Sequence, residues 1–357
     1  MGEIWILGAS GRCGRAISHL LAGAELSPVL VGRDGMGLRN LAATISDDTR
    51  VVTVEAIEEI ASEITRNAPK VVVNTIGPFD ESALPIALAC PPGTHYVDLS
   101  NEISSILAIL ELDASAKLAD RTLVTGAGFG VLATESVVMK LCADHPGAQR
   151  VRVAALPALA ATSIRIGSAM AGSIISGLSR GGQQYAEAQL AHIPVFGDME
   201  VLSLPDGAQV ETFAVPSGDL VAVQRASGAP FVVAASNLVP GTALWRRLLP
   251  ITAGLCRLRT IRNVVGRFLA DVPLRPQAAA TTNSWAHARV AWPSGVIRQG
   301  WLRTGEAMAF TAAVAAETVL RLARDEGRPG AYTPGALFGP GLAQRAGGEF
   351  LLDGEGS

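Results

Sequence analysis

A glycine-rich turn near the start of the chain constrains the fold more than any other feature of the sequence. The apolar run at residues 4–7 reads as a strand, residues 8–14 follow with the spacing G-x-x-G-x-x-G, and residues 15–21 read as a helix. Glycines let a backbone turn sharply and come close to a ligand, and the first N–H groups of a helix face anionic groups. A strand, a glycine turn and a helix in this order predict a cradle for the phosphates of a dinucleotide.

The first third of the chain repeats this alternation of strands and helices. Further strands are expected at 28–33, 51–54, 70–76, 95–98 and 122–125, and helices at 36–45, 56–66, 83–89 and 103–118. Alternating strands and helices form a parallel sheet with helices on both faces, and apolar runs suit strands that are buried on both sides. We expect an α/β fold with a Rossmann doubly wound sheet in the order 3-2-1-4-5-6 and a ligand crevice at the carboxyl ends of the strands.

The remaining residues read as a second α+β domain with a mixed or antiparallel sheet. Strands separated by turn residues are expected at 151–156, 200–204, 209–214, 221–225, 231–235, 286–292 and 300–302, and helices at 167–182 and 306–324. We place the Rossmann domain at 1–128 with 305–357 and the substrate and dimerisation domain at 129–304. A basic amphipathic segment at 245–269 is expected either as a core helix or as a docking surface for a carrier protein or a membrane.

Composition narrows the functional classes. The net charge of −3 argues against a nucleic-acid binder. Cys13, Cys90, Cys142 and Cys256 contain no C-x-x-C pair, so we expect reduced intracellular thiols and neither a disulfide framework nor a zinc site. The sequence has no cluster of histidines and carboxylates that would suggest a metal site. The apolar runs are shorter than the ~20 residues that span a bilayer, and no signal peptide precedes the first strand, so we expect a cytoplasmic protein.

The end of the second expected strand bears on the choice of cofactor. An acidic side chain there binds the 2′-hydroxyl of NAD, whereas an arginine accommodates the 2′-phosphate of NADP. The chain has Arg33 followed by Asp34 at this point. Arg33 can pair with the phosphate and stack on adenine, and Arg12 in the glycine turn can add a second positive charge. NADP(H) is therefore favoured over NAD(H), which remains the alternative if Asp34 points into the ribose pocket.

The expected site collects residues from the ends of several strands. The cofactor-binding residues are expected to be Gly8, Ser10, Gly11, Arg12, Cys13, Gly14, Arg33, Asp34, Asn74, Ile76, Gly77, Pro78 and Phe79. The turn at 76–79 suits an approach to the nicotinamide half, although an ordinary strand-to-helix turn explains it equally well. Candidate catalytic proton donors are Tyr96, Asp98 and Glu102, and the substrate pocket is assigned to Ser100, Gly128 and Phe129.

Several short motifs occur together along the chain in one order. They lie at 8–14, 31–34, 74–79, 96–102 and 126–130, and near the end at 331–340 and 346–350. In this combination the chain resembles the saccharopine dehydrogenase-like oxidoreductases, which include saccharopine reductases and the trans-acting enoyl reductases of bacterial lipid and polyketide pathways. The resemblance implies an NAD(P)-binding Rossmann domain, a second domain with substrate and dimer contacts, and a C-terminal segment that returns to the first domain.

One segment departs from the members of this superfamily that handle amino acids. Their segment after the sixth strand resembles Cys-Gly-Phe-Asp, whereas the chain has Ala127-Gly128-Phe129-Gly130, without the thiol and the carboxylate. We therefore expect a homodimeric NADP-dependent oxidoreductase that reduces a C=C or C=N bond of a small apolar or carrier-linked metabolite, with secondary metabolism as one setting. The alternatives are a saccharopine-type amino-acid dehydrogenase and a non-catalytic NADP-binding sensor or structural protein.

Overall fold

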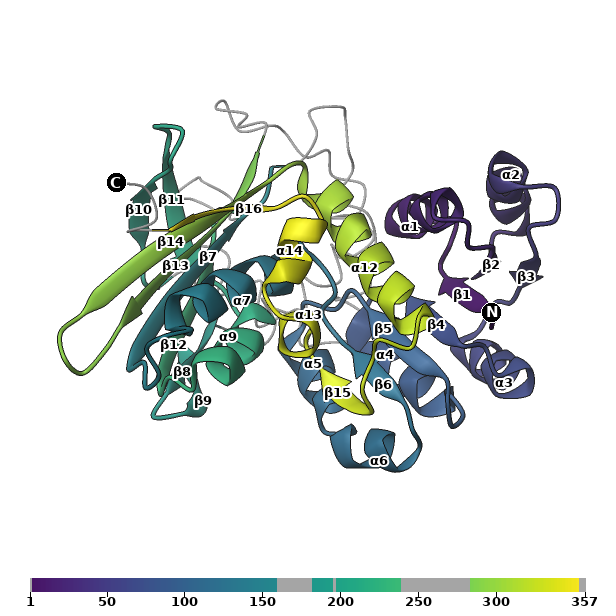
Figure 1. The fold of residues 1–357 in the computed structure, drawn as a ribbon, viewed down its shortest axis with the longest axis horizontal. Coiled ribbons are helices and arrows are strands. Elements are labelled where there is room, and N and C mark those ends of the chain that lie inside the picture. Colours follow the sequence, from purple (N-terminus) through teal and green to yellow (C-terminus); the bar gives the residue numbers. More distant parts are fainter. Residues whose placement is uncertain (1, 159–181, 195–196, 239–282, 353–357) are drawn as a thin grey trace. The chain divides into compact units, whose positions relative to one another are not determined.

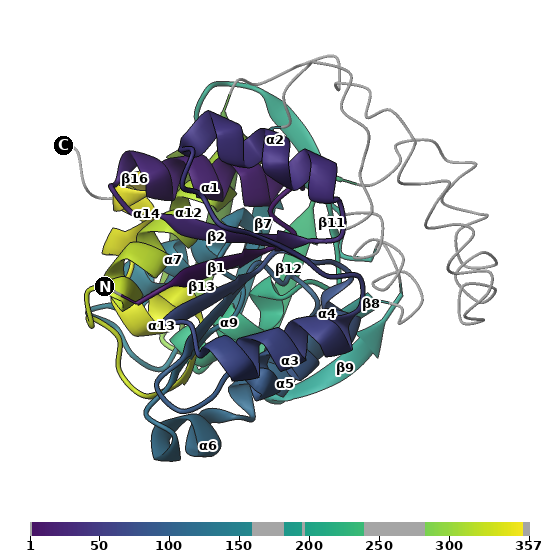
Figure 2. The same cartoon turned by 90° about the vertical axis from the view of Figure 1, so that its right-hand side faces the viewer.

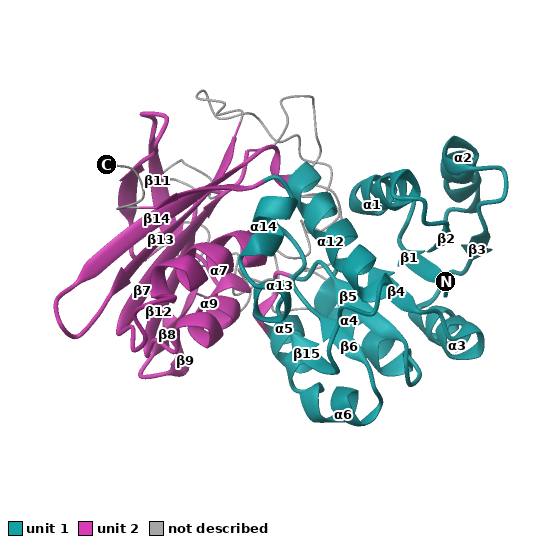
Figure 3. Cartoon of the chain, viewed as in Figure 1, with its two compact units in different colours: residues 1–100, 104–129, 308–347 teal, residues 101–103, 130–307, 348–357 magenta. Residues whose placement is uncertain are grey.

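The structure is a computed structural model that describes residues 2–158, 182–194, 197–238 and 283–352 (Figure 1). Two compact units divide the chain, as Figure 3 shows. Unit 1 comprises Met1–Ser100, Ser104–Phe129 and Met308–Gly347, and unit 2 comprises Asn101–Ile103, Gly130–Ala307 and Gly348–Ser357. Residues 167–181 of one expected helix and the whole basic segment at 245–269 lie outside the described residues.

Unit 1 contains a seven-stranded parallel sheet. Its strands are β1 (Ile4–Leu7), β2 (Pro28–Gly32), β3 (Val51–Thr53), β4 (Val71–Asn74), β5 (His95–Asp98), β6 (Thr122–Val124) and β15 (Gly330–Tyr332). The observed order β15-β6-β5-β4-β1-β2-β3 confirms the expected order 3-2-1-4-5-6 and adds a seventh strand, β15, parallel to β6. Every residue of β1, β2 and β4 is buried, as expected for strands covered on both faces.

Helices cover both faces of this sheet. They are α1 (Arg12–Gly23), α2 (Gly35–Ile45), α3 (Ile57–Asn67), α4 (Phe79–Ala89), α5 (Ile103–Leu110), α6 (Asp113–Leu118), α12 (Ala307–Ala323), α13 (Pro334–Phe338) and α14 (Gly341–Arg345). Figure 2 shows α1 and α2 on one face and α3 and α4 on the other. In α1, Ile17 and Leu21 lie one turn apart and are both fully buried, which places the apolar side of the helix on the sheet.

The prediction of one helix at 103–118 was wrong, because the segment forms α5 and α6 with a break between them. Asp113 begins α6, and its Oδ1 accepts a hydrogen bond from the N–H of Ala331 in β15 at 3.0 Å. Its other carboxylate oxygen pairs with Lys117 at 2.7 Å. The start of α6 is thus tied to a strand more than two hundred residues further along the chain.

Unit 2 contains a nine-stranded mixed sheet, in agreement with the expected fold class. Its strands are β7 (Arg150–Leu156), β8 (Gly182–Ala186), β9 (Gln189–Ile193), β10 (Glu200–Ser203), β11 (Gln209–Ala214), β12 (Phe231–Ser236), β13 (Ser284–Ala291), β14 (Ile297–Thr304) and β16 (Glu349–Leu352). The main path runs β10-β11-β12-β7-β13-β14-β16, and β8 joins β12 and β9. Only β7 and β12 pair in parallel among the described strands of this sheet; the other pairs are antiparallel.

Two helices of unit 2 are described, α7 (Phe129–Cys142) and α9 (Asp219–Ser227). A Cβ at Gly300 of β14 would lie 3.5 Å from side-chain atoms of Val137 and Leu141, so α7 packs closely on that face of the sheet.

The prediction of a strand at 221–225 was wrong, because these residues lie within α9. A short apolar run suits a buried helix as well as a strand, and Gly228 ends this helix in the left-handed conformation at φ +66°.

The face of the sheet that carries Arg152 holds a charged cluster. The side chain of Arg152 is 9% exposed, and its Nε lies 2.8 Å from Asp198 and 3.0 Å from Glu200. Its Nη2 donates to the hydroxyl of Thr212 at 3.1 Å, and Arg289 makes two further bonds to Glu200. These contacts link β7 and β13 to the strands β10 and β11 at the edge of the sheet.

Among the helices that the structure describes, none has the length and apolar character that a membrane span requires.

Candidate functional site

The glycine turn joins β1 to α1 and packs tightly on β2. Gly8 has φ +73°, and the N–H groups of Gly8 and Ala9 donate to the carbonyl of Val31 at 2.8 and 3.2 Å. Gly11 is the N-cap of α1 and donates to the carbonyl of Gly8 at 2.9 Å. A Cβ at Gly14 would lie 2.5 Å from that carbonyl oxygen, so a residue without a side chain is required there. The turn presents the positive end of α1 at the carboxyl end of β1, where an anion is favoured.

The other predicted residues of the turn surround this helix start. The carbonyl of Ser10 accepts a hydrogen bond from Nε of Arg15 at 2.8 Å, which fixes the backbone just before the helix. Arg12 is exposed and Cys13 is half-buried and forms no disulfide, and both lie in the first turn of α1. The structure therefore brings these side chains together around one helix terminus, and their contacts with a cofactor stay predictions.

The end of β2 lies beside the glycine turn. A Cβ at Gly32 would be 3.9 Å from Cα of Gly8, which shows how closely the two backbones approach. Asp34 is the N-cap of α2, and its Oδ1 accepts the N–H of Gly37 at 2.9 Å. Arg33 is exposed and makes no hydrogen bond or ion pair within the described ranges. The acid at this strand end is used by the helix, whereas the arginine is available to a ligand.

Asn74 shapes the turn that follows β4. Its side chain is fully buried, and Oδ1 accepts the N–H of Ile76 at 3.0 Å. Nδ2 donates to the hydroxyls of Ser82 at 3.1 Å and Tyr96 at 3.3 Å. The Gly77–Pro78 peptide bond that follows is cis. Asn74 thus supports the backbone of the turn from the buried side. The residues of this segment that a ligand can reach are those of the turn itself.

The two predicted donors on β5 are both fully buried. Oδ1 of Asp98 accepts from the N–H groups of Ser100 and Gly126 at 3.0 and 2.9 Å and from the hydroxyl of Thr125 at 2.9 Å. Its Oδ2 has no hydrogen-bond partner in the described part of the chain. Burial raises the pKa of Asp98 to about 6. Burial and the neighbouring Asp98 raise the pKa of Tyr96 well above its usual range, so its hydroxyl stays protonated at neutral pH.

Phe129 closes the segment that follows β6. The ring is 5% exposed and packs edge-to-face on Phe310 of α12, with ring centroids 6.1 Å apart. Its N–H donates to the hydroxyl of Thr311 at 3.1 Å, and a Cβ at Gly128 would lie 3.2 Å from the methyl group of the same threonine. The predicted pocket residues Gly128 and Phe129 therefore form an apolar, closely packed wall against α12 within unit 1.

The remaining predicted residues are also buried. Phe79 begins α4 and is 6% exposed, and Ser100 is 1% exposed just beyond β5. Glu102 is 5% exposed and belongs to unit 2, where one carboxylate oxygen accepts the N–H of Asn101 at 3.1 Å. The catalytic roles of Tyr96, Asp98 and Glu102 stay predictions, since each already has a partner inside the fold.

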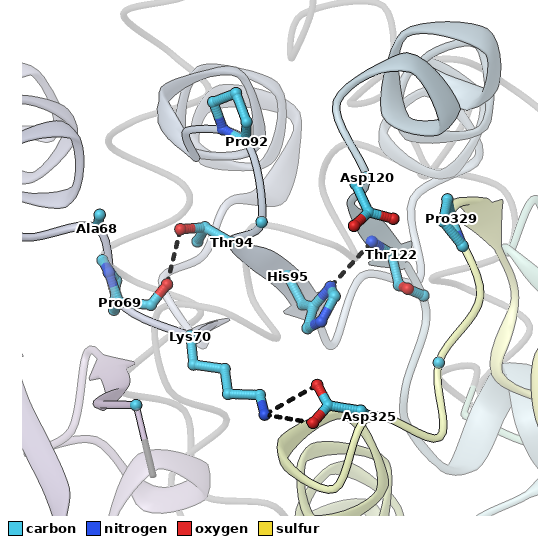
Figure 4. A pocket seen from close by; sticks show the side chains of 13 residues that line it. Ala68, Pro69, Lys70, Pro92, Thr94, His95, Asp120, Thr122, Asp325 and Pro329 are labelled. Carbon is cyan, nitrogen blue, oxygen red and sulfur yellow. Dashed lines mark hydrogen bonds and ion pairs between the residues drawn. The ribbon is translucent and has the colours of Figure 1, made fainter.

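A cavity of about 480 Å³ opens at the amino ends of β4, β5 and β6, opposite the predicted crevice (Figure 4). Lys70 and Asp325 form an ion pair of 2.9 Å across it, and Nδ1 of His95 accepts the N–H of Thr122 at 3.0 Å. Burial and the nearby Lys70 lower the pKa of His95, so this ring is neutral at pH 7. These polar groups bond to one another and fasten the strands to the end of α12.

The carboxyl edge of the sheet in unit 1 fits a nicotinamide dinucleotide. The close-packed glycine turn requires residues without side chains, because a Cβ at Gly8, Gly11 or Gly14 would lie 2.5–3.1 Å from neighbouring protein atoms, and a turn of this kind before a helix suits a pyrophosphate. Arg33 lies at the end of β2, where the adenosine ribose of a bound dinucleotide lies in sheets of this kind. Across the described ranges, no group of histidine, cysteine and acidic side chains is placed to hold a metal ion.

Comparison of the sequence with known proteins finds relatives for part of the chain. No family model matches. The trans-acting enoyl reductase of Mycobacterium leprae is 31% identical over 107 residues, which are 28% of this chain and 26% of the relative. The trans-acting enoyl reductase of Mycobacterium tuberculosis is 29% identical over a stretch of the same length. The chain thus matches about a quarter of the length of these curated relatives.

Comparison of the fold reaches the whole chain. The apo saccharopine dehydrogenase (L-Glu forming) of Saccharomyces cerevisiae superposes with a TM-score of 0.61 over 99% of this chain and 100% of that chain. The sequences are 12% identical in this superposition, so the likeness is one of fold. The chain has the saccharopine dehydrogenase fold, and the resemblance of its sequence motifs to the saccharopine dehydrogenase-like oxidoreductases is confirmed.

Proposed function

We propose that the protein is an NADP(H)-dependent reductase of a C=C or C=N bond in a small apolar or carrier-linked metabolite. The observation that carries the cofactor choice is the end of β2. Asp34 caps α2 through Gly37 at 2.9 Å, whereas Arg33 is exposed without a partner in the described part of the chain. The cap uses one oxygen of the Asp34 carboxylate, whereas the whole guanidinium of Arg33 is open to a ligand, which favours the arginine as the group that selects the cofactor.

A bound nicotinamide supplies the hydride. The residues of this chain bind the cofactor, orient it and exclude water from the site. The turn at 8–14 holds the pyrophosphate through backbone N–H groups and the positive end of α1. Asn74 fixes the turn at 76–79 beside it. Tyr96, Asp98 and Glu102 remain the proposed proton donors, and of these Tyr96 holds its proton at neutral pH because burial raises its pKa.

Two observations favour an apolar or carrier-linked substrate. Phe129 and Phe310 form a buried aromatic wall, and the segment at 127–130 contains no charged group. The curated relatives over part of the chain are named trans-acting enoyl reductases. A homodimer in the cytoplasm that contacts a carrier protein is part of the same proposal and rests on this resemblance. The saccharopine-type dehydrogenase is the second candidate, supported by the fold of the yeast enzyme.

Substitution of Arg33 tests the choice of cofactor. In Arg33→Ala we expect the dissociation constant of NADPH to rise about 10- to 100-fold, because charge-assisted bonds to the 2′-phosphate are lost, while NADH binding changes little. Isothermal titration calorimetry measures both constants. Arg324→Ala removes one exposed positive charge elsewhere in unit 1 and serves as the matched control. Equal losses for NADH and NADPH would refute the NADP assignment.

Turnover distinguishes the candidate reactions. NADPH oxidation is followed by absorbance with crotonyl-type thioesters and, separately, with mixtures of keto acids and amines. Oxidation with the thioesters alone supports the enoyl-type reductase, and oxidation with the mixtures alone supports the saccharopine-type dehydrogenase. Tight NADPH binding without turnover of either class favours a non-catalytic NADP-binding protein.

A further inference from the structure

We propose that Arg39 is a second arm of the site for the 2′-phosphate, so that Arg33 and Arg39 clamp this group between them. The inference rests on the proposed NADP(H) dependence and assigns part of its selectivity to a residue inside α2. Arg39 lies six residues after Arg33, the position that is normally associated with the choice between NAD and NADP. Its place becomes apparent only from the fold.

The position of the Arg39 guanidinium carries the inference. A Cβ built on Gly35, the first residue of α2, would lie 3.3 Å from Nη1 of Arg39 and 3.1 Å from the hydroxyl of Thr53. Side chains on a helix lean toward its amino terminus, so Arg39 reaches back over the first turn of α2. Thr53 ends β3 and pairs with Gly32 at the end of β2. The guanidinium therefore lies at the same strand ends from which Arg33 extends.

The charges around Arg39 leave it available to an anion. Arg39 is exposed and has no hydrogen bond or ion pair among the residues that the structure describes. The acid between the two arginines, Asp34, is engaged in capping α2 through Gly37. Two guanidinium groups form a site for a dianionic phosphate, which planar arginine forks bind through paired hydrogen bonds.

The absence of a side chain at Gly35 is part of the same arrangement. A methyl group there would meet both Arg39 and Thr53 at close contact, and the flexible arginine would have to move. A glycine at the start of α2 thus lets the guanidinium lie against the helix backbone. Gly35→Ala is therefore a second variant, which crowds the Arg39 guanidinium and leaves its charge unchanged.

Binding of two nucleotides to the full chain tests the clamp without any need for turnover. Adenosine 2′,5′-bisphosphate carries the phosphate in question and adenosine 5′-monophosphate lacks it, and calorimetry measures both. In Arg39→Ala we expect the bisphosphate to bind about tenfold more weakly and the monophosphate to bind as before. Arg39→Lys, which keeps the charge without the fork, should fall between Arg39→Ala and the wild type. Arg324→Ala is the control for loss of one positive charge.

The outcomes separate this inference from the proposed function. If the wild type binds both nucleotides equally, the NADP assignment fails and the clamp fails with it. If the wild type prefers the bisphosphate and Arg33→Ala removes that preference while Arg39→Ala leaves it intact, the proposed function stands and the clamp is refuted. Loss of the preference in Arg39→Ala, with unchanged affinity for the monophosphate, supports the clamp.

Discussion

Asp219 gives the sharpest prediction about stability. The residue begins α9 and is 1% exposed; one carboxylate oxygen accepts a long bond of 3.4 Å from Thr134, and the other has no partner in the described residues. Burial raises its pKa from 3.8 to about 6. A raised carboxyl pKa means that the folded state binds more protons than the unfolded chain. Stability from this group is therefore present below about pH 4 and is lost as the pH rises through about 6.

The size of the effect follows from the shift. About two pKa units correspond to about 3 kcal/mol of unfolding free energy, as an order of magnitude. Asp219→Asn replaces the carboxyl by an amide of similar shape that stays neutral at every pH. We expect the variant to gain stability relative to the wild type by up to about 3 kcal/mol between pH 4 and pH 7. Asp98, which has a raised pKa for the same reason, is unchanged in both proteins and drops out of the difference.

Urea denaturation followed by tryptophan fluorescence at a series of pH values measures this difference. Among the tryptophans that the structure describes, Trp285, Trp292 and Trp301 belong to unit 2 together with Asp219, so the signal reports on the relevant unit. Asp144→Asn removes an exposed carboxyl of the same unit and is the matched control. A constant offset between Asp219→Asn and the wild type from pH 4 to pH 7 would show that the carboxyl of Asp219 reaches water, and the reasoning from burial would fail.

Two further predictions concern the glycine turn and the charged cluster. Gly14→Ala places a Cβ 2.5 Å from a carbonyl oxygen, and we expect calorimetry to show loss of NADPH binding, whereas Gly23→Ala, with no atom within 4 Å, should raise the unfolding free energy by about 0.5–1 kcal/mol. Arg152→Leu leaves Asp198 and Glu200 without a buried partner and should lower the unfolding free energy by about 1–3 kcal/mol, since both acids are partly exposed. Unchanged urea midpoints in Arg152→Leu would contradict this assignment.

The first six strands of unit 1 were predictable because their signals are local. Each apolar run of the first third is bounded by turn residues, and the glycine turn requires a particular neighbour on each side. The break between α5 and α6 was not predictable, because Asp113 is held by Ala331, a partner far away in sequence. The strand expected at 221–225 failed for another reason. Four buried apolar residues in a row suit either structure, and the signals that were overlooked are Asp219 in the first turn and Gly228 at the end.

The predicted site likewise contains some features that the sequence could reveal and others that it could not. The glycines and Arg33 follow from a strand-turn-helix pattern, and the structure places them at neighbouring strand ends. The sequence argument did not identify Arg39, because it lies inside a helix, where an arginine is typical of a solvated surface. The full burial of Tyr96 and Asp98 was equally hidden, since position at a strand end does not reveal which way a side chain points.

The seventh strand of the parallel sheet has a consequence for synthesis on the ribosome. β15 pairs with β6, and about 200 residues separate the two strands in the chain. At typical elongation rates the edge of β6 therefore waits about 10–40 s for its neighbour to emerge. An unpaired parallel edge is a template for other extended chains. The β6 edge of the nascent protein is thus open to misassociation with other extended chains until β15 has emerged and paired with it.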